Sequence, residues 1–162
     1  MSKVTVFGAG AWGSTMAQVL SDAGNDVLLW GRSPEVITEI NTLHTNRKYL
    51  GNHVLPETLV ATNSLDDAFA FSEVYVLAIP AQQIRATLEE WKSRFSETCT
   101  IVSTLKGIEI STQMRMTEVI IDVIGMHKIA IITGPNLADE LVLRQPAGAV
   151  AAAASLELAD QI

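Results

Sequence analysis

The amino-acid sequence predicts an α/β fold: a doubly wound, mostly parallel sheet with helices on both faces. Short apolar runs alternate with helix-like patterns along the whole 162-residue chain. The runs, such as Val74–Ile79, contain few polar residues, which is typical of strands covered by helices on both sides. Repeated strand–helix units imply parallel strands joined by right-handed crossovers.

Hydrophobic periodicity places the individual elements. The predicted strands are Lys3–Phe7, Asp26–Trp30, Leu59–Thr62, Glu73–Ile79, Thr100–Ser103, Lys128–Ile132 and Gly148–Ala153. The predicted helices are Ala11–Ala23, Pro34–Asn41, Leu65–Ala70, Ala81–Arg94, Gln113–Ile124 and Leu137–Leu143. The segment between Asn41 and Leu59 shows neither pattern, so a long loop is expected there.

Residues that commonly begin or end helices stand at these boundaries. Gly24 follows the first predicted helix, where a glycine often ends one, and Pro34 occupies a first helical position. An amphipathic helix is also expected to begin near residue 155, close to the end of the chain. The expected N-caps are Ser33, Ser64, Ser111 or Thr112, Asn136 and Ser155.

The composition is typical of a globular domain with a substantial core. Hydrophobic residues make up 48% of the chain and charged residues 18%. The formal net charge of −7 argues against a nucleic-acid or anionic membrane partner. One cysteine, Cys99, excludes an internal disulfide and favours a cytoplasmic location. There is no signal-peptide pattern, and no apolar run is long enough to span a membrane.

The N-terminal segment carries the clearest functional signal. The first predicted strand breaks into Gly8-x-Gly10-x-x-Gly13, and a helix pattern follows at once. Gly8 permits a tight turn, Gly10 leaves room for a pyrophosphate against the backbone, and Gly13 lets the helix pack close to the strand. The helix N-terminus adds unpaired N–H groups. This context predicts a Rossmann-like dinucleotide-binding site, with a glycine-rich turn in another α/β protein as the alternative.

The end of the second predicted strand bears on which dinucleotide binds. An acidic residue commonly binds the ribose 2′-hydroxyl of NAD at this position, whereas this sequence has Gly31-Arg32-Ser33. A guanidinium suits a 2′-phosphate or stacks on adenine. Arg32 therefore favours NADPH and remains compatible with NADH; a solvated arginine at a helix start is the alternative.

Three more segments follow predicted strands and are expected at the same crevice. Lys106 could hold a hydroxyl, carbonyl or phosphate of a substrate through its ammonium. Gln83 is a candidate for the nicotinamide half of the cofactor, and Asn136, after a turn at Gly134, is a candidate polar anchor. The structural alternatives are a solvated lysine, a helix-start glutamine and a helix N-cap.

The aromatic residues divide by position. Trp12 lies inside the glycine turn and is expected to border the cofactor, whereas Trp30 and Trp91 are expected to pack in the core or at an interface. Tyr49, in the long loop, is expected to cover the cofactor; an aromatic folded onto the core from a surface loop is the alternative.

Other polar residues give weaker signals. Arg47 or Lys48 would meet a phosphate if the long loop closed over the cofactor. Cys99 begins an apolar strand and is expected to be buried packing. No metal site is predicted, because metal-ligand spacing is lacking among the histidines, which are His44, His53 and His127.

Six motifs occur in a fixed order over almost the whole chain. They are Gly8-Ala-Gly10-Ala-Trp12-Gly13, Trp30-Gly31-Arg32, Asn46-x-x-Tyr49-Leu50, Ile79-Pro80-Ala81-Gln82, Thr104-Leu-Lys106-Gly107-Ile-Glu109 and Gly134-Pro-Asn136-Leu-Ala138-Asp-Glu140. Each motif is weak alone, but the ordered set is specific. Together the motifs resemble those of the bacterial NAD(P)-dependent glycerol-3-phosphate dehydrogenases.

The resemblance implies that NADH or NADPH reduces dihydroxyacetone phosphate to sn-glycerol 3-phosphate, a precursor of phospholipids. It implies substrate contacts from Lys106, Gly134 and Asn136. Many members have Ser where this chain has Ala11 and Asn136; both changes are tolerable, since Ala11 would act through its backbone. The implied cofactor contacts, beside the turn glycines Gly8, Gly10 and Gly13, are Ala11, Trp12, Arg32, Tyr49, Lys106 and Ala138.

Members of that family continue into a helical second domain, which carries the lysine taken as the proton-transfer group. Residues 1–162 are therefore expected to form one dinucleotide-binding domain, cut within a helix that leads to the second. This chain alone would bind dinucleotide weakly and would not turn over, because it lacks the main acid–base group.

The sequence leaves two other interpretations of the function open. One is the N-terminal domain of a different NADP-dependent dehydrogenase, such as a ketopantoate reductase or a 6-phosphogluconate-type enzyme. The other is a non-catalytic dinucleotide-sensing module. The oligomeric state is also open, a homodimer of the full-length protein included.

Overall fold

The computed structural model describes residues 2–125 and 128–162, so His127 lies outside the described residues. The strands of the central sheet are β1 (Lys3–Phe7), β2 (Asp26–Trp30), β3 (Val60–Thr62), β4 (Val74–Leu77), β5 (Thr100–Ser103), β6 (Lys128–Thr133) and β7 (Val150–Ala153). The helices are α1 (Ala11–Asp22), α2 (Pro34–Leu43), α3 (Arg47–Leu50), α4 (Leu65–Phe71), α5 (Ile84–Trp91), α6 (Met116–Ile124), α7 (Ala138–Val142) and α8 (Leu156–Gln161), with 3₁₀ turns η1 (Ala81–Gln83) and η2 (Lys92–Arg94) flanking α5.

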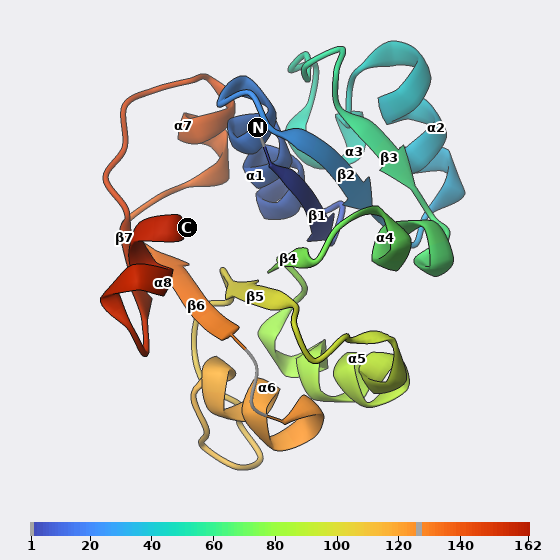
Figure 1. The fold of residues 1–162 in the computed structure, drawn as a ribbon. Coiled ribbons are helices and arrows are strands. Elements are labelled where there is room, and N and C mark those ends of the chain that lie inside the picture. The colour runs from blue at the N-terminus through green and yellow to red at the C-terminus, as the bar shows by residue number, and fades with distance from the viewer. Residues whose placement is uncertain (1, 126–127) are drawn as a thin grey trace.

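The described strands form one sheet in the order β3-β2-β1-β4-β5-β6-β7 (Figure 1). Neighbouring strands are parallel except for β7, which runs antiparallel to β6. The predicted doubly wound, mostly parallel sheet is thus confirmed. The strand order reverses between β1 and β4, and parallel sheets of this kind bind ligands at the carboxyl ends beside such a reversal.

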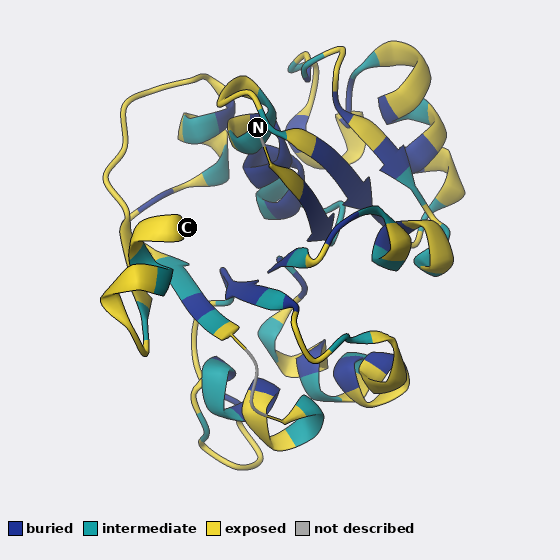
Figure 2. Ribbon diagram, viewed as in Figure 1, coloured by how far each residue is buried: buried dark blue, intermediate teal, exposed yellow. Residues whose placement is uncertain are grey.

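Alternating residues of the central strands β1, β2, β4 and β5 enter two different cores. Val4 and Val6 of β1 point to the face covered by α1, α2, α3 and α7, whereas Phe7 points to the face covered by α4, α5 and α6. Figure 2 shows this arrangement as largely buried central strands, β1, β2, β4 and β5, between helices with exposed outer surfaces. Phe7 packs against the ring of Trp91, with 5.1 Å between centroids. Burial on both faces explains why the strands lack polar residues.

Most expected boundaries are confirmed. Gly24 follows α1 with a φ of +85°, a conformation that glycine adopts without steric cost. The expected side-chain caps at α2, α4 and α8 each accept a backbone N–H; these caps are Ser33, Ser64 and Ser155.

Two expected caps are wrong. The helix predicted from Gln113 begins at Met116, because Gln113 has a φ of 61° and cannot be helical. Its N-cap is Arg115 in place of Ser111 or Thr112. The Arg115 N–H donates to Glu118 Oε2 at 2.8 Å, and its Nη2 donates to Glu118 Oε1 at 2.6 Å. At α7 the N-cap is Leu137, without a side-chain hydrogen bond, so Asn136 is not the cap.

The long segment after α2 is more ordered than expected. It contains the four-residue helix α3, which is too short to show a periodic pattern. An isolated antiparallel bridge between Thr45 and Val54 closes the rest of the loop. In the described parts of the chain, no helix combines the length and apolar character needed to cross a membrane.

Candidate dinucleotide-binding site

A cavity of about 960 Å³ lies at the carboxyl ends of β1, β2, β4 and β5. This is the position that the reversal of strand order predicts. Most of the residues singled out from the sequence line it: Gly8, Gly10, Ala11, Trp12, Arg32, Tyr49, Lys106, Asn136 and Ala138. Gly13, Gly134 and Gln83 lie outside the lining. Each contacts a residue that lines the cavity: Gly13 packs against Gly8, the Gly134 carbonyl accepts from Lys106, and Gln83 accepts from Arg32.

The three turn glycines have different surroundings. Gly8 has a φ of +121°, and a Cβ on it would lie 2.5 Å from the carbonyl oxygen of Ala78, the residue after β4. A Cβ on Gly13 would lie 1.7 Å from the carbonyl oxygen of Gly8. A Cβ on Gly10 would meet nothing within 4 Å. Gly8 and Gly13 are therefore required by the fold, whereas Gly10 keeps open a space that faces the cavity.

Helix α1 points its N-terminus into this space. The first helical hydrogen bond runs from the Ser14 N–H to the Gly10 carbonyl, at 3.0 Å. The N–H groups of Ala11, Trp12 and Gly13 precede it and have no partner within the helix. Gly10 provides no side-chain cap, and no acidic residue lies in the first turn. Open space in front of free N–H donors fits a pyrophosphate.

One end of the cavity suits an adenosine group. Arg32 follows β2, and its Nη2 donates to Oε1 of Gln83 at 3.4 Å. Gln83, a candidate for the nicotinamide half, is thus bonded to the residue expected at the adenosine half. Trp30 and Trp91 are buried as expected, with 5.0 Å between their ring centroids. Both also line the cavity. The sequence did not indicate that second role.

At the other end of the cavity, Lys106 contacts three segments of the chain. Its Nζ donates to the carbonyl oxygens of Asn136 at 3.1 Å and Gly134 at 3.4 Å. The same Nζ lies 5.2 Å from the centroid of the Trp12 ring, a cation–π arrangement. The loops after β5 and β6 and the glycine turn thus converge on one ammonium group.

The loop before α3 is tied to the glycine turn by a residue whose role was missed. Asn46 is fully buried, and its Nδ2 donates to the Ala9 carbonyl at 3.1 Å and to Ser14 Oγ at 2.8 Å. These bonds hold Tyr49, which follows on α3, at the cavity wall. Asn46 stands in a motif quoted above, but only the tertiary contact reveals what it does.

Several other candidates lie outside the cavity lining. Arg47 and Lys48 are absent from the lining, and the Arg47 N–H instead donates to Glu39 Oε1 at 2.8 Å. Cys99 is fully buried, as expected, and burial raises its pKa to about 11. Among residues 2–125 and 128–162, no three His, Cys, Asp or Glu side chains are grouped so that they could hold a metal ion.

Comparison with known proteins identifies the family. A family model described as the NAD-dependent glycerol-3-phosphate dehydrogenase N-terminus matches residues 3–159. Glycerol-3-phosphate dehydrogenase (NAD(P)+) of Corynebacterium diphtheriae is 46% identical over 162 residues, which are 99% of this chain and 49% of that protein. Glycerol-3-phosphate dehydrogenase (NAD(P)+) 2 of Mycobacterium tuberculosis is 46% identical over 93% of this chain and 46% of its own length.

Solved structures agree. The crystal structure of glycerol-3-phosphate dehydrogenase from Coxiella burnetii is similar with a TM-score of 0.90 at 25% identity, covering 99% of this chain and 49% of that one. The Saccharomyces cerevisiae enzyme gives 0.86 at 28% identity, over 94% of this chain and 47% of that one. This chain thus spans about half the length of its relatives.

The family model, the relatives and the cavity all indicate that the strand–turn–helix unit of β1 and α1 binds a dinucleotide. The residues around the cavity fit a dinucleotide, since Gly10 leaves its space open and α1 directs free N–H groups into it. The chain belongs to the NAD-dependent glycerol-3-phosphate dehydrogenase family, as its N-terminal, NAD(P)-binding Rossmann-like domain.

Proposed function

We propose that this chain provides the cofactor-binding half of an oxidoreductase that reduces dihydroxyacetone phosphate to sn-glycerol 3-phosphate with NADPH or NADH. The observation that carries the proposal is the Lys106 ammonium at one end of the cavity, opposite the end marked by Arg32. One end thus suits an anionic or carbonyl substrate and the other suits adenosine, with the pyrophosphate-binding turn between them.

Lys106 retains a donor for the substrate. An ammonium has three N–H groups, and two of them are directed to the Gly134 and Asn136 carbonyls. The third is left for an oxygen of the substrate, whose charge or dipole the ammonium stabilises. NAD(P)H, when bound, supplies the hydride. Asn136 adds an amide that can donate and accept at the same end of the cavity.

The remaining parts of the activity belong to the same proposal. The proton-transfer lysine belongs to the second domain, in the half of the relatives' length that this chain does not cover. The 162 residues alone bind dinucleotide and do not turn over. A homodimer of the whole protein, the absence of a nucleic-acid partner and a cytoplasmic location complete the proposal; the low cysteine content, one residue in the chain, supports the location.

The test compares two substrates and two proteins. The protein expressed from its complete reading frame and the 162-residue chain are assayed by loss of reduced-nicotinamide absorbance. The complete protein is expected to oxidise NADPH with dihydroxyacetone phosphate and far more slowly with dihydroxyacetone, while the 162-residue chain shows no turnover. Equal rates with both ketones would contradict the proposed substrate. Turnover by the 162-residue chain alone would contradict the proposal that the proton-transfer group lies outside it.

A further inference from the structure

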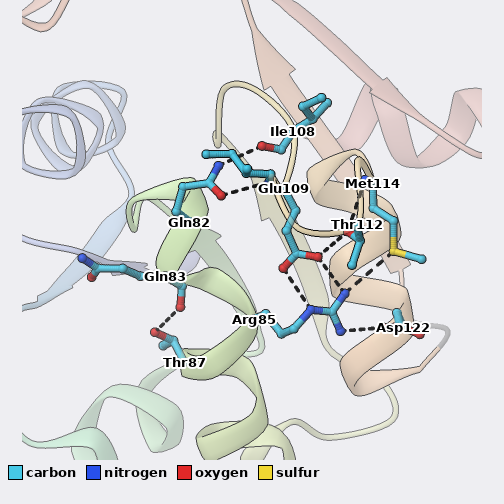
Figure 3. A network of polar contacts seen from close by, with 10 residues as sticks. Gln82, Gln83, Arg85, Thr87, Ile108, Glu109, Thr112, Met114 and Asp122 are labelled. Atoms are coloured by element: carbon cyan, nitrogen blue, oxygen red, sulfur yellow. Dashed lines mark hydrogen bonds and ion pairs between the residues drawn. The ribbon is translucent and has the colours of Figure 1, made fainter.

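The loop that carries Lys106, residues 104–115, is braced by side chains from the segment that follows β4 (Figure 3). We propose that Gln82, Arg85 and Glu109 are positioning residues, which fix this loop so that the Lys106 ammonium stays at the Trp12 ring. The inference rests on the proposed function, because that function gives the position of Lys106 its importance.

Glu109 is held by an unusually complete set of partners. Arg85 of α5 donates to both carboxylate oxygens, at 2.9 Å from Nε to Oε1 and 3.0 Å from Nη2 to Oε2. The Thr112 hydroxyl also donates to Oε2. Such a two-pronged pair fixes orientation as well as distance. These bonds lower the pKa of Glu109, so the carboxylate is charged at neutral pH.

Arg85 is itself oriented by α6. Its third nitrogen, Nη1, donates to Asp122 Oδ2 at 2.6 Å. Glu109 is the only charged residue among the buried polar residues that the structure describes. Because burying a charge is costly and a buried ion pair rarely gives net stability, the arrangement is better explained by the orientation of the loop.

Gln82 holds the backbone on both sides of Glu109. Its Nε2 donates to the Ile108 carbonyl at 2.8 Å, and its Oε1 accepts the Ile110 N–H at 3.1 Å. The amide therefore pairs with the loop as a neighbouring strand would. Gln82 follows Ala81, which lines the cavity. The brace consequently joins the wall after β4 to the wall after β5.

Lys106 lies between two anchors. On one side, the Thr104 hydroxyl donates to the Leu77 carbonyl at 2.8 Å. On the other side is Glu109 with its partners. Between these anchors Lys106 and Gly107 are exposed, and Gly107 has a φ of +99°. Since this short arch is exposed, its two anchors fix the backbone from which the Lys106 side chain reaches the Gly134 and Asn136 carbonyls.

The test follows Lys106 directly. The protein from the complete reading frame is labelled with ¹³C at the lysine Cε, and the Lys106 signal is assigned with Lys106→Arg. The Trp12 ring current displaces this signal from that of a solvated lysine. Glu109→Gln and Gln82→Ala are each expected to move it toward the solvated value. Lys3, whose Nζ lies 5.2 Å from the Phe71 centroid, serves as the internal reference.

Kinetics provide the second readout. Both variants are expected to lower kcat/KM for dihydroxyacetone phosphate by about tenfold or more, since small misplacements of a binding group are costly. Affinity for 2′,5′-ADP, which probes the end marked by Arg32, is expected to change less than about twofold. The matched control is Asp66→Asn, which removes one carboxylate and its 2.5 Å bond to Arg94 and leaves all three quantities unchanged.

The outcomes separate the two proposals. If Glu109→Gln prevents folding, Gln82→Ala still decides, because the Gln82 side chain is exposed. A Lys106 signal that does not move in a folded Gln82→Ala protein would overturn the brace. A wild-type protein without dihydroxyacetone phosphate reductase activity would instead overturn the proposed function, and the lysine signal would still report on the loop.

Discussion

At the residue scale, Gly10 and Gly13 differ in what they accommodate. Gly10 faces open space, and Gly13 contacts the backbone of Gly8. We expect Gly10→Ala to fold with little change in the free energy of unfolding and to lose affinity for dinucleotide. Loss of one charge-assisted hydrogen bond, about 1.5–3 kcal/mol, corresponds to binding weakened about tenfold or more.

The matched variant Gly13→Ala is expected to lower the stability of the fold, which Gly10→Ala leaves nearly unchanged. Its Cβ would lie 1.7 Å from the Gly8 carbonyl oxygen, so the turn must distort and unfolding should become easier by about 3 kcal/mol or more. Urea denaturation and NADPH titration of both variants check the pair. Equal destabilisation by the two substitutions would show that Gly10 also serves the fold.

Arg32 is the residue that bears on cofactor choice. We expect Arg32→Ala to weaken NADPH binding by about tenfold or more, as expected for a lost guanidinium–phosphate pair. NADH, which has no 2′-phosphate, should bind within about threefold of its wild-type affinity. Gln83→Ala, which removes only the partner of Arg32, is the control. Equal losses for both cofactors would assign Arg32 to adenine stacking.

At the element scale, the carboxylate of Glu109 should make stability depend on pH. Hydrogen bonds from Arg85 and Thr112 hold its pKa below the ordinary value. A group with a lowered pKa in the folded state stabilises the fold above its unfolded-state pKa, about 4.3 for Glu. That contribution is lost as the pH falls through the folded-state value.

The expected result is a pH-dependent difference between wild type and Glu109→Gln. The difference in free energy of unfolding should be largest near neutral pH and should shrink as the pH falls below about 4. Urea denaturation at a series of pH values measures it. The other carboxylates with lowered pKa are common to both proteins, so they cancel. A difference that does not vary with pH would mean that Glu109 contributes by its shape alone.

Elements with a local signal could be predicted, and those set by distant contacts could not. The strands and most helices follow hydrophobic periodicity, and Ser33 and Ser64 are caps because their bonds are local. Helix α3 is too short for periodicity, and the positive φ of Gln113 is imposed by its loop. The Arg85–Glu109 pair joins residues 24 positions apart, which no local pattern indicates.

The same division holds for the site. The glycine turn, Arg32 and Lys106 could be placed at the crevice because each follows a predicted strand, and parallel strands end at one edge of a sheet. Asn46 and Gln82 could not be assigned roles, since their partners belong to other loops. The binding roles of the residues around the cavity stay predictions.

At the scale of the whole molecule, the sheet order brings distant segments around one cavity. Trp12 follows β1, Lys106 follows β5 and Asn136 follows β6, and all three line the cavity. All three tryptophans of the chain line it as well: Trp12, Trp30 and Trp91. A dinucleotide bound along this cavity would therefore lie close to all three tryptophans, with its nicotinamide nearest to Trp12.

Energy transfer from tryptophan to bound NADPH measures this directly. The 162-residue chain is titrated with NADPH while tryptophan is excited and reduced-nicotinamide emission is recorded, with Gly10→Ala titrated in parallel. A saturable signal that fits one site per chain, and that Gly10→Ala strongly weakens without unfolding the protein, is expected. A signal that does not saturate, or one that Gly10→Ala leaves unchanged, would contradict binding of the dinucleotide at the glycine turn.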